Sequence, residues 1–199
     1  MSDFILASSS ITRLELLKKA CFVPKHIASP DVDETPLKKE KPTEYLSRIP
    51  KAKAEKVMET FLGENILAAD SIVSLRGRVV QKLKSEEDIV FYYKHLYSGR
   101  RIRALTGVYF INKTGKTSSK IVESIIKFKH LSEDDINTIL KHKETLLRCA
   151  GGISIELLEC ITIGIIGSYS NIRGLPLYEV RNMLLSNGIK SDDGVQVVR

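Results

Sequence analysis

The chain alternates two apolar patterns, short continuous runs and residues spaced three to four apart. Runs bounded by turn residues predict strands over residues 4–7, 66–69, 72–75, 79–80, 106–112, 120–128, 153–158 and 160–166. Helical spacing predicts helices over residues 11–20, 43–62, 86–97, 132–147 and 176–186. Because proline lacks an amide donor and clashes with the preceding turn, Pro50 is expected to bend or split the second helix. Helices and strands interleave without a strict repeat, so we predict an α/β fold with a mixed sheet.

Length and composition set the broad class. With 199 residues, of which 43% are hydrophobic, the chain is expected to form one domain over residues 1–199 that needs no disulfides. The most apolar run, Cys160–Ile166, is too short to span a bilayer, and the N-terminus lacks a secretory pattern. We therefore expect a cytoplasmic protein with no membrane partner. The cysteines and histidines show no spacing typical of a zinc site or a disulfide framework.

A net charge of +7 points to anionic partners, either nucleic acid or phosphorylated small molecules. Much of the lysine excess falls in polar stretches such as residues 37–41, which are typical of a solvated surface. The chain also lacks a recognition-helix motif and the interleaved basic and aromatic residues of an RNA-binding face. Nucleic acid is therefore the weaker expectation, and a basic binding protein without catalysis stays open as an alternative.

Polar residues follow the first predicted strand directly. Ser8, Ser9 and Ser10 lead into a helix whose first turn carries Arg13. Such a turn offers amide and hydroxyl donors and the positive end of the helix dipole, all suited to phosphate oxygens, and Arg13 adds a forked cation. The alternative is that Ser10 caps the helix and Arg13 is solvated.

Carboxylates and lysines form a second set of candidates. Asp70 follows a predicted strand and suits a metal ligand, a general base or a turn residue. The acidic segment 31–34 suits Mg²⁺ or a solvated loop. Lys53 and Lys82 each read alone as surface lysines. Together, these groups are what metal-assisted cleavage of a phosphoanhydride requires.

Short motifs occur in a fixed order along nearly the whole chain. They are Leu6-Ala7-Ser8-x-Ser10-x-x-Arg13-x-x-Leu16-Leu17, Asp31-Val32-Asp33-Glu34-Thr35-Pro36, Lys53-Ala54, Ala69-Asp70-Ser71, Gly77, Lys82, Ser98-Gly99, Leu105-Thr106-Gly107-Val108, Leu131-Ser132-Glu133, Cys149-Ala150-Gly151 and Gly174-Leu175-Pro176-Leu177. Each motif is weak alone, but the ordered set resembles the Maf family of nucleotide pyrophosphatases.

The resemblance implies a hydrolase that uses a divalent metal, Mg or Mn, to cut nucleoside triphosphates between the α and β phosphates. The products are a monophosphate and pyrophosphate, and the reaction keeps non-standard nucleotides out of nucleic acid. The implied fold is a mixed sheet with flanking helices, in two lobes around a central cleft, similar to inosine-triphosphate pyrophosphatases. Family members are cytoplasmic and often homodimeric, and they are associated with septum formation and arrest of cell division.

The resemblance also implies roles for individual residues. Asp70 would accept the proton of the attacking water. The residues that would bind the triphosphate are Ser8, Arg13, Lys53 and Lys82. Glu34, with Asp70 itself, would hold the metal.

Specificity is expected to depend on Glu156, which stands where the dTTP- and UTP-cleaving branch has a glutamine. A carboxylate only accepts hydrogen bonds, so it suits the adjacent N–H donors of guanine and opposes the carbonyl oxygens of uracil or thymine. The motifs most resemble the branch that acts on 7-methyl-GTP, although Thr12 replaces an aromatic residue usual there. Thr12 and Ser71, beside Arg13 and Asp70, are further specificity candidates, and dTTP or UTP stays the alternative substrate.

Overall fold

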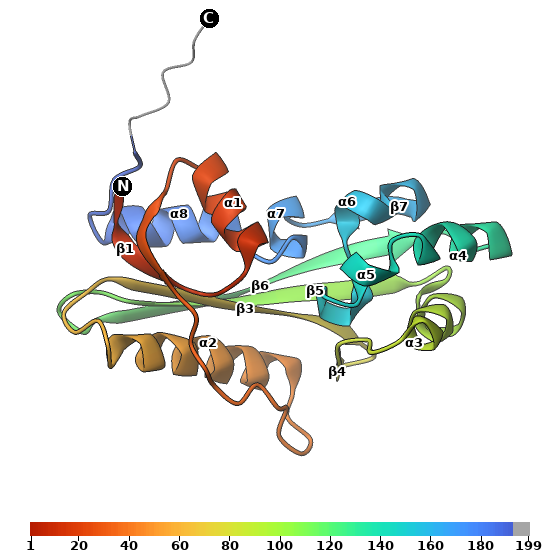
Figure 1. Cartoon of the computed structure of the whole chain (residues 1–199), viewed down its shortest axis with the longest axis horizontal. Coiled ribbons are helices and arrows are strands. Elements are labelled where there is room, and N and C mark those ends of the chain that lie inside the picture. The colour runs from red at the N-terminus through yellow and green to blue at the C-terminus, as the bar shows by residue number, and fades with distance from the viewer. Residues whose placement is uncertain (193–199) are drawn as a thin grey trace, which may run out of the picture.

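The computed structural model describes residues 1–192 and is built on one seven-stranded sheet (Figure 1). The strands are β1 (Ser2–Ala7), β2 (Pro24–Ala28), β3 (Ile66–Leu75), β4 (Arg78–Val80), β5 (Arg101–Ile111), β6 (Thr117–Phe128) and β7 (Thr162–Ile166). Their order is β2-β1-β3-β5-β6-β7, with β4 paired to β3. Strand β1 is parallel to β2 and β3, and the other pairings are antiparallel. The predicted mixed sheet is confirmed.

Helices cover both faces of the sheet and gather around one end. They are α1 (Ile11–Lys19), α2 (Pro42–Met58), α3 (Glu86–Phe91), α4 (Glu133–Leu140), α5 (Lys143–Leu146), α6 (Ile155–Leu158), α7 (Tyr169–Ile172) and α8 (Leu177–Ser186). Helices α1 and α8 lie on one face and α2 on the other, while α3 to α6 lie toward the far end of the long strands (Figure 1). Within residues 1–192, no helix combines the length and apolarity needed to cross a bilayer.

The buried side chains divide into separate clusters that correspond to two lobes. One cluster joins β1 and β3 to α1 and α8, and a second joins the same strands to α2 on the opposite face. The largest cluster lies at the other end, around the aromatic residues of the α3 region and the apolar residues of α4 to α6. This division supplies the two lobes that the sequence predicts.

Serine side chains cap three of the helix starts, including the expected cap at Ser10. The Ser10 hydroxyl accepts the amide of Arg13 at 3.4 Å, and Ser85 accepts the amide of Asp88 at 3.2 Å. Ser132 forms a reciprocal capping box with Asp135. Side-chain oxygens here satisfy amides that would have no partner within the helix.

Strand β3 differs from the prediction in a way that matters for the site. Residues 66–69 and 72–75 were expected to be separate strands, but they form one continuous strand that runs through Asp70. The reason is β5, which pairs with β3 without a break from Ile66 to Ser74. Asp70 therefore lies within a strand, and its expected place at a strand end is wrong.

The opposite edge of β3 is interrupted at the same place. Its pairing with β1 ends at Ala68, and its pairing with β4 begins at Val73. Within the described residues, positions 69–72 of β3 therefore have no strand neighbour on that edge. This gap, which contains Asp70 and Ser71, gives a ligand access to the middle of the sheet.

Three further predictions are wrong. Residues 24–28 form strand β2, which the sequence analysis missed because most of this edge strand is not buried and its apolar pattern is weak. Residues 153–158 lie in a turn and helix α6 instead of a strand, since a short apolar run does not by itself distinguish the two. The helix expected over 132–147 breaks into α4 and α5 at Lys141 and His142.

Helix α2 continues through Pro50 and does not split. Pro50 cannot donate to the carbonyl of Leu46, four residues earlier, so that oxygen loses its usual helical partner. The Leu46 carbonyl oxygen lies against Gly107 of β5, where an added Cβ would sit only 2.4 Å from it. Glycine at this position therefore allows α2 to approach the sheet closely, opposite Asp70 on the neighbouring strand.

Candidate functional site

A cleft of about 1050 Å³ lies between the two lobes and is lined by every residue to which the sequence assigns a binding, catalytic, metal or specificity role. Its walls come from the β1–α1 turn, the acidic loop before α2, α2 itself, the middle of β3, β4, and residues from 145–156 and 171–174. The sequence-predicted residues that line it are Ser8, Thr12, Arg13, Glu34, Lys53, Asp70, Ser71, Lys82 and Glu156. The fold therefore collects in one cavity residues that are spread over most of the chain.

Arg13 is buried, so the alternative of a solvated arginine is wrong. Its Nε donates to the carbonyl of Gly174 at 2.9 Å, Nη1 donates to the Ser8 hydroxyl at 3.0 Å and Nη2 donates to the Ser71 hydroxyl at 3.1 Å. All three acceptors are neutral oxygens. Burial lowers the pKa of the guanidinium, and nearby carboxylates act in the opposite direction. The result is a fixed cation whose charge remains available to an anionic ligand.

A chain of hydroxyl groups holds the arginine in place from behind. Ser71 also donates to the Gly174 carbonyl at 3.2 Å and shares a hydrogen bond of 3.0 Å with Thr106, its cross-strand partner on β5. The single proton of Thr106 serves either this bond or a bond to the carbonyl of Asn171 at 3.2 Å. The Asn171 side chain in turn donates to Ser124 on β6 at 3.0 Å. Ser71 is thus part of the scaffold that positions Arg13.

Lys53 links the two carboxylates of the site. Its buried ammonium donates to Asp70 Oδ1 at 2.6 Å and lies 2.7 Å from Glu34 Oε1. The reading of Lys53 as a surface lysine is therefore wrong. Glu34 remains about half exposed, while the Asp70 side chain is nearly buried. Charges of alternating sign thus meet at the floor of the cleft, within reach of a polyanion.

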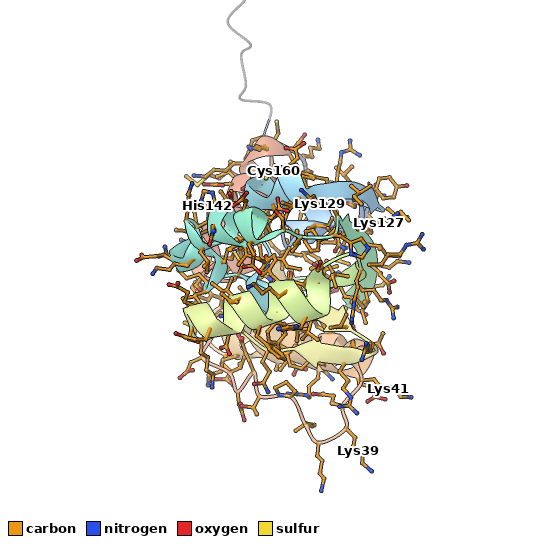
Figure 2. All side chains as sticks on the ribbon, turned by 90° about the vertical axis from the view of Figure 1, so that its right-hand side faces the viewer. Lys39, Lys41, Lys127, Lys129, His142 and Cys160 are labelled. Atoms are coloured by element: carbon orange, nitrogen blue, oxygen red, sulfur yellow. The ribbon has the colours of Figure 1, made fainter. Side chains whose placement is uncertain are left out.

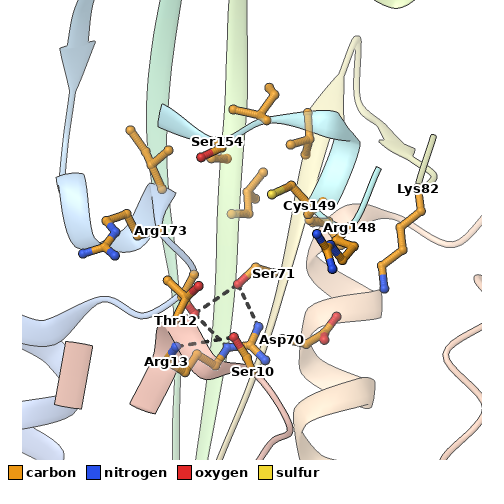
Figure 3. Close-up of a pocket in the computed structure, with 18 of the residues that line it drawn as sticks. Ser10, Thr12, Arg13, Asp70, Ser71, Lys82, Arg148, Cys149, Ser154 and Arg173 are labelled. Carbon is orange, nitrogen blue, oxygen red and sulfur yellow. Dashed lines mark hydrogen bonds between the residues drawn. The ribbon is translucent and has the colours of Figure 1, made fainter. Parts of the chain in front are cut away.

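The pleat of β3 places Asp70 and the Arg13–Ser71 contact on opposite faces of the sheet. Successive side chains of a strand point to opposite faces, so Asp70 points toward α2 and Ser71 toward α1 and α7. In Figure 3, Asp70 extends over α2 while Arg13 reaches Ser71 from the other side. A ligand in the gap of β3 can therefore contact both groups at once.

Tyr45 of α2 is part of the same floor and was missed by the sequence analysis. Its hydroxyl donates to the backbone carbonyl of Glu34 at 3.1 Å, which ties the acidic loop to α2. Burial raises the pKa of Tyr45, and the charges of Asp70 and Glu34 raise it further. The hydroxyl therefore stays protonated and keeps its role as a donor.

The outer wall carries Lys82 and Arg148, which are exposed. In Figure 3 both side chains extend from this wall in the direction of Asp70. Cys149 lies beside them, and burial raises the pKa of its thiol, although the charges of Arg148 and Lys82 oppose the shift. The wall therefore adds exposed cations to the buried Arg13 and Lys53.

Two tyrosines fix the backbone of this wall from behind. A π-helical segment, Tyr92–Tyr97, continues α3 and carries Tyr93 and Tyr97 in the core. Tyr93 donates to the Gly152 carbonyl at 2.7 Å, and Tyr97 donates to the Gly151 carbonyl at 2.8 Å. Gly151 has a φ of +55°, and an added Cβ would meet Val73 at 2.6 Å, so glycine is required there.

Glu156 lies in the cleft, but it is not a lone carboxylate. Its Oε1 lies 2.8 Å from Nη2 of Arg173, which follows α7. Figure 3 shows Arg173 on the side of the cleft opposite Lys82. The sequence analysis missed Arg173, whose only signal was its position immediately before the Gly174-Leu175-Pro176-Leu177 motif.

Glu34 and Asp70 are the residues suited to hold a metal. Within residues 1–192, no group of three or more His, Cys, Asp or Glu side chains gathers around one point. Mg²⁺ commonly uses one or two carboxylates and completes its shell with waters and substrate phosphates. Two hard carboxylate oxygen donors at the floor of a polyanion-sized cleft fit that pattern.

Comparison with known proteins places these residues in a family context. The family model described as Maf-like protein matches residues 3–187. A nucleoside triphosphate pyrophosphatase of Neorickettsia sennetsu is 39% identical over 189 residues, covering 94% of this chain and 90% of the relative. A dTTP/UTP pyrophosphatase of Chelativorans sp. is 34% identical over 197 residues, covering 96% and 93%.

Among solved structures, a nucleoside-triphosphatase described as a dITP/XTP pyrophosphatase from Mycobacterium abscessus overlaps 64% of this chain and 74% of its own, with 12% identity and a TM-score of 0.38. An overlap of this extent says nothing about the site. The match of the family model over almost the whole chain, and relatives of this similarity over 90% and 93% of their own lengths, establish that the chain belongs to the Maf-like protein family.

Proposed function

We propose that this chain is a nucleoside triphosphate pyrophosphatase that hydrolyses the α–β phosphoanhydride and releases a monophosphate and pyrophosphate. The observation that carries the proposal is the arrangement at the cleft floor, where Lys53 bridges Asp70 and Glu34 at 2.6 and 2.7 Å beside the buried Arg13. The relatives support the same activity, since the Neorickettsia protein carries that name.

In the proposed reaction, Asp70 accepts a proton from a water whose oxygen forms a new bond to the α-phosphorus. The bond from that phosphorus to the bridging oxygen breaks, and pyrophosphate leaves with the bridging oxygen. Positive charge must be placed on the phosphates before this attack, because their oxygens repel the incoming oxygen. Arg13, Lys53, Lys82 and the hydroxyl of Ser8 would supply this charge and the accompanying donors.

Lys53 would have a second role because it contacts the catalytic carboxylate directly. In the structure its ammonium serves both carboxylates. A bound triphosphate offers the ammonium a third anionic partner, so part of its interaction with Asp70 would pass to the phosphates. Substrate binding would thereby make an Asp70 oxygen available to accept the proton from water.

A divalent cation, Mg²⁺ or Mn²⁺, is part of the proposal. Held by Glu34 and Asp70 together with phosphate oxygens, it would supply further neutralisation of the phosphates. The remaining steps above depend on the chain's own side chains.

For the base, we propose a guanine-like purine, including 7-methylguanine, because a carboxylate such as Glu156 only accepts hydrogen bonds and a guanine edge presents N–H donors. Thr12 and Ser71 line the same cleft, although Ser71 is engaged with Arg13. The Chelativorans relative, named a dTTP/UTP pyrophosphatase, favours pyrimidine triphosphates as the alternative.

The alternative of a basic, nucleic-acid-binding protein lacks support in the charge distribution. Lys129, Lys94 and Lys143 lie within ion-pair distance of Asp135, Glu133 and Glu86. Figure 2 views the molecule from the right-hand side of Figure 1. Lys39 and Lys41 project at the bottom of this view, whereas Lys127 and Lys129 lie toward the upper right. The labelled lysines therefore do not form one continuous basic surface.

The test is a panel of triphosphates, ordinary and modified, incubated with the protein and Mg²⁺ or Mn²⁺, with pyrophosphate measured directly. We expect pyrophosphate and monophosphate in equal amounts, with guanine-like bases preferred. Release of inorganic phosphate and a diphosphate would contradict cleavage at the α–β bond. A preference for dTTP and UTP would contradict the assignment to Glu156.

A further inference from the structure

Glu156, the carboxylate proposed to read the base, is held by an arginine outside the family motifs. Arg173 is only 8% exposed in its side chain, whereas Glu156 is 51% exposed. The Nη2 atom of Arg173 lies 2.8 Å from Glu156 Oε1 and 3.7 Å from Glu15 Oε2. The arginine therefore joins α6, which carries Glu156, to α1, which carries Glu15.

The position of Arg173 along the chain is equally restricted. The next residue, Gly174, has a φ of +100° and accepts hydrogen bonds from Arg13 and Ser71 through its carbonyl. The backbone next to Arg173 is thus fixed by the same contacts that hold Arg13 in place. Among the described residues, the buried Nε of Arg173 has no hydrogen-bond partner. Its ion pair with Glu156 is therefore the main compensation for burying this cation.

We propose that Arg173 is a positioning residue for base selection, and that the base is read by the Arg173–Glu156 pair and not by a free carboxylate. This inference rests on the proposed function. Because Oε1 is engaged with Arg173, Oε2 is the oxygen left to accept an N–H of the base. Because the arginine neutralises the carboxylate, the pair gives little electrostatic advantage to a cationic base over a neutral one of the same shape.

The consequence is a prediction about charge. Guanine and 7-methylguanine present the same N–H donors to Glu156, but the methylated base carries a positive charge. With Arg173 present, the two triphosphates should be processed with similar kcat/KM. Without it, Glu156 becomes an uncompensated carboxylate, and the cationic base should gain about fivefold, the size expected for a partly exposed charge pair.

The experiment compares Arg173→Met, Arg173→Lys, Glu156→Gln and the Arg173→Met/Glu156→Gln double variant with the unmodified protein. The measured quantity is the ratio of kcat/KM for 7-methyl-GTP to that for GTP, at mildly acidic pH where the methylated base keeps its charge. We expect Arg173→Met to raise this ratio about fivefold and Arg173→Lys, which retains the cation, to change it less than twofold. Glu156→Gln leaves the arginine cation uncompensated and should lower the ratio, and adding Arg173→Met in that background should restore it toward the value of the unmodified protein.

A purely structural role would behave differently, because a loosened cleft lowers kcat/KM for both nucleotides together. An unchanged ratio in Arg173→Met, or a double variant whose ratio stays as low as that of Glu156→Gln alone, would overturn the inference. If Arg173→Met fails to fold, the Arg173→Lys and Glu156→Gln variants decide. A large change of the 7-methyl-GTP to GTP ratio in Arg173→Lys, or an unchanged ratio in Glu156→Gln, would overturn the inference.

Binding of non-hydrolysable α,β-methylene analogues of GTP and 7-methyl-GTP, measured by calorimetry, separates this inference from the proposed function. If the ratio of the two analogues' binding constants shifts among the variants as described, but the protein shows no turnover, the proposed function is contradicted and base reading by the Arg173–Glu156 pair is supported. Turnover of triphosphates with no shift in the ratio of binding constants would support the proposed function and contradict base reading by the pair. Absence of binding for both analogues would overturn both.

Discussion

The two sides of the cleft are built differently. At the floor, Arg13, Lys53 and Asp70 are 9%, 6% and 8% exposed, and each makes a direct contact with another residue of the site. At the outer wall, Lys82 and Arg148 are exposed. Side chains at the floor are thus held by one another before a ligand arrives, whereas those at the wall are exposed to solvent, and within residues 1–192 Arg148 hydrogen-bonds only to the carbonyl of Glu144 on its own segment.

This difference indicates a division of work. Reactions that move a proton need groups held in place, because geometry at the reacting atoms contributes much of the rate. Cations that only attract a polyanion tolerate mobility, and an exposed lysine loses side-chain freedom when it binds. The floor should therefore control kcat, and the wall should mainly control KM.

The largest expected effect comes from the floor. Asp70→Asn removes the proton acceptor and should lower kcat by about 10²–10⁴-fold, the range typical of general-base catalysis. The fold should survive, because the buried Lys53 keeps Glu34 as a partner at 2.7 Å. Pyrophosphate release at saturating triphosphate measures the effect, and thermal unfolding monitors the fold.

Asp134→Asn, on the exposed first turn of α4, is the matched control and should behave like the unmodified protein. Turnover of Asp70→Asn within a few-fold of normal, in a folded protein, would assign the proton transfer to some other group. It would also remove the proposed contrast in kcat between floor and wall.

A smaller effect is expected at the wall. Lys82→Met should raise KM about tenfold with a lesser change in kcat, since a single charge-assisted contact to a phosphate contributes about 1.4 kcal/mol. Lys51→Met is the control: Lys51 is also an exposed lysine, lies on α2 at 3.8 Å from Glu55 and does not line the cleft. A fall in kcat as deep as that of Asp70→Asn would place Lys82 with the floor.

Sequence and structure agree best where the site is local. Ser8, Ser10 and Arg13 lie within six consecutive residues, so a strand followed directly by a helix is enough to bring them together. The cap at Ser10 and the helix after it follow from residue type and spacing. Burial of Arg13 does not follow, because it depends on the carbonyl of Gly174, which the fold brings from 161 residues away.

Predictions failed where a neighbouring element decides the outcome. Asp70 was expected at a strand end, but continuous pairing with β5 carries the strand through it, and only the interrupted edge toward β1 and β4 opens the site. The Glu156–Arg173 pair joins residues 17 positions apart by sequence number, and no local pattern marks it. Charge matching of this kind requires the tertiary structure.

The smallest expected effect tests whether the wall is held from behind. Tyr97→Phe removes a buried hydroxyl that donates to the Gly151 carbonyl at 2.8 Å, and burial keeps that hydroxyl protonated by raising the pKa of Tyr97. Loss of this bond should lower the free energy of unfolding by about 1 kcal/mol, measured by denaturant titration. Tyr178→Phe, at an exposed position, should leave the free energy of unfolding unchanged.

If the division between floor and wall holds, Tyr97→Phe will also raise KM slightly and leave kcat intact. A loss of kcat would mean that residues 149–152 position the reacting groups as well.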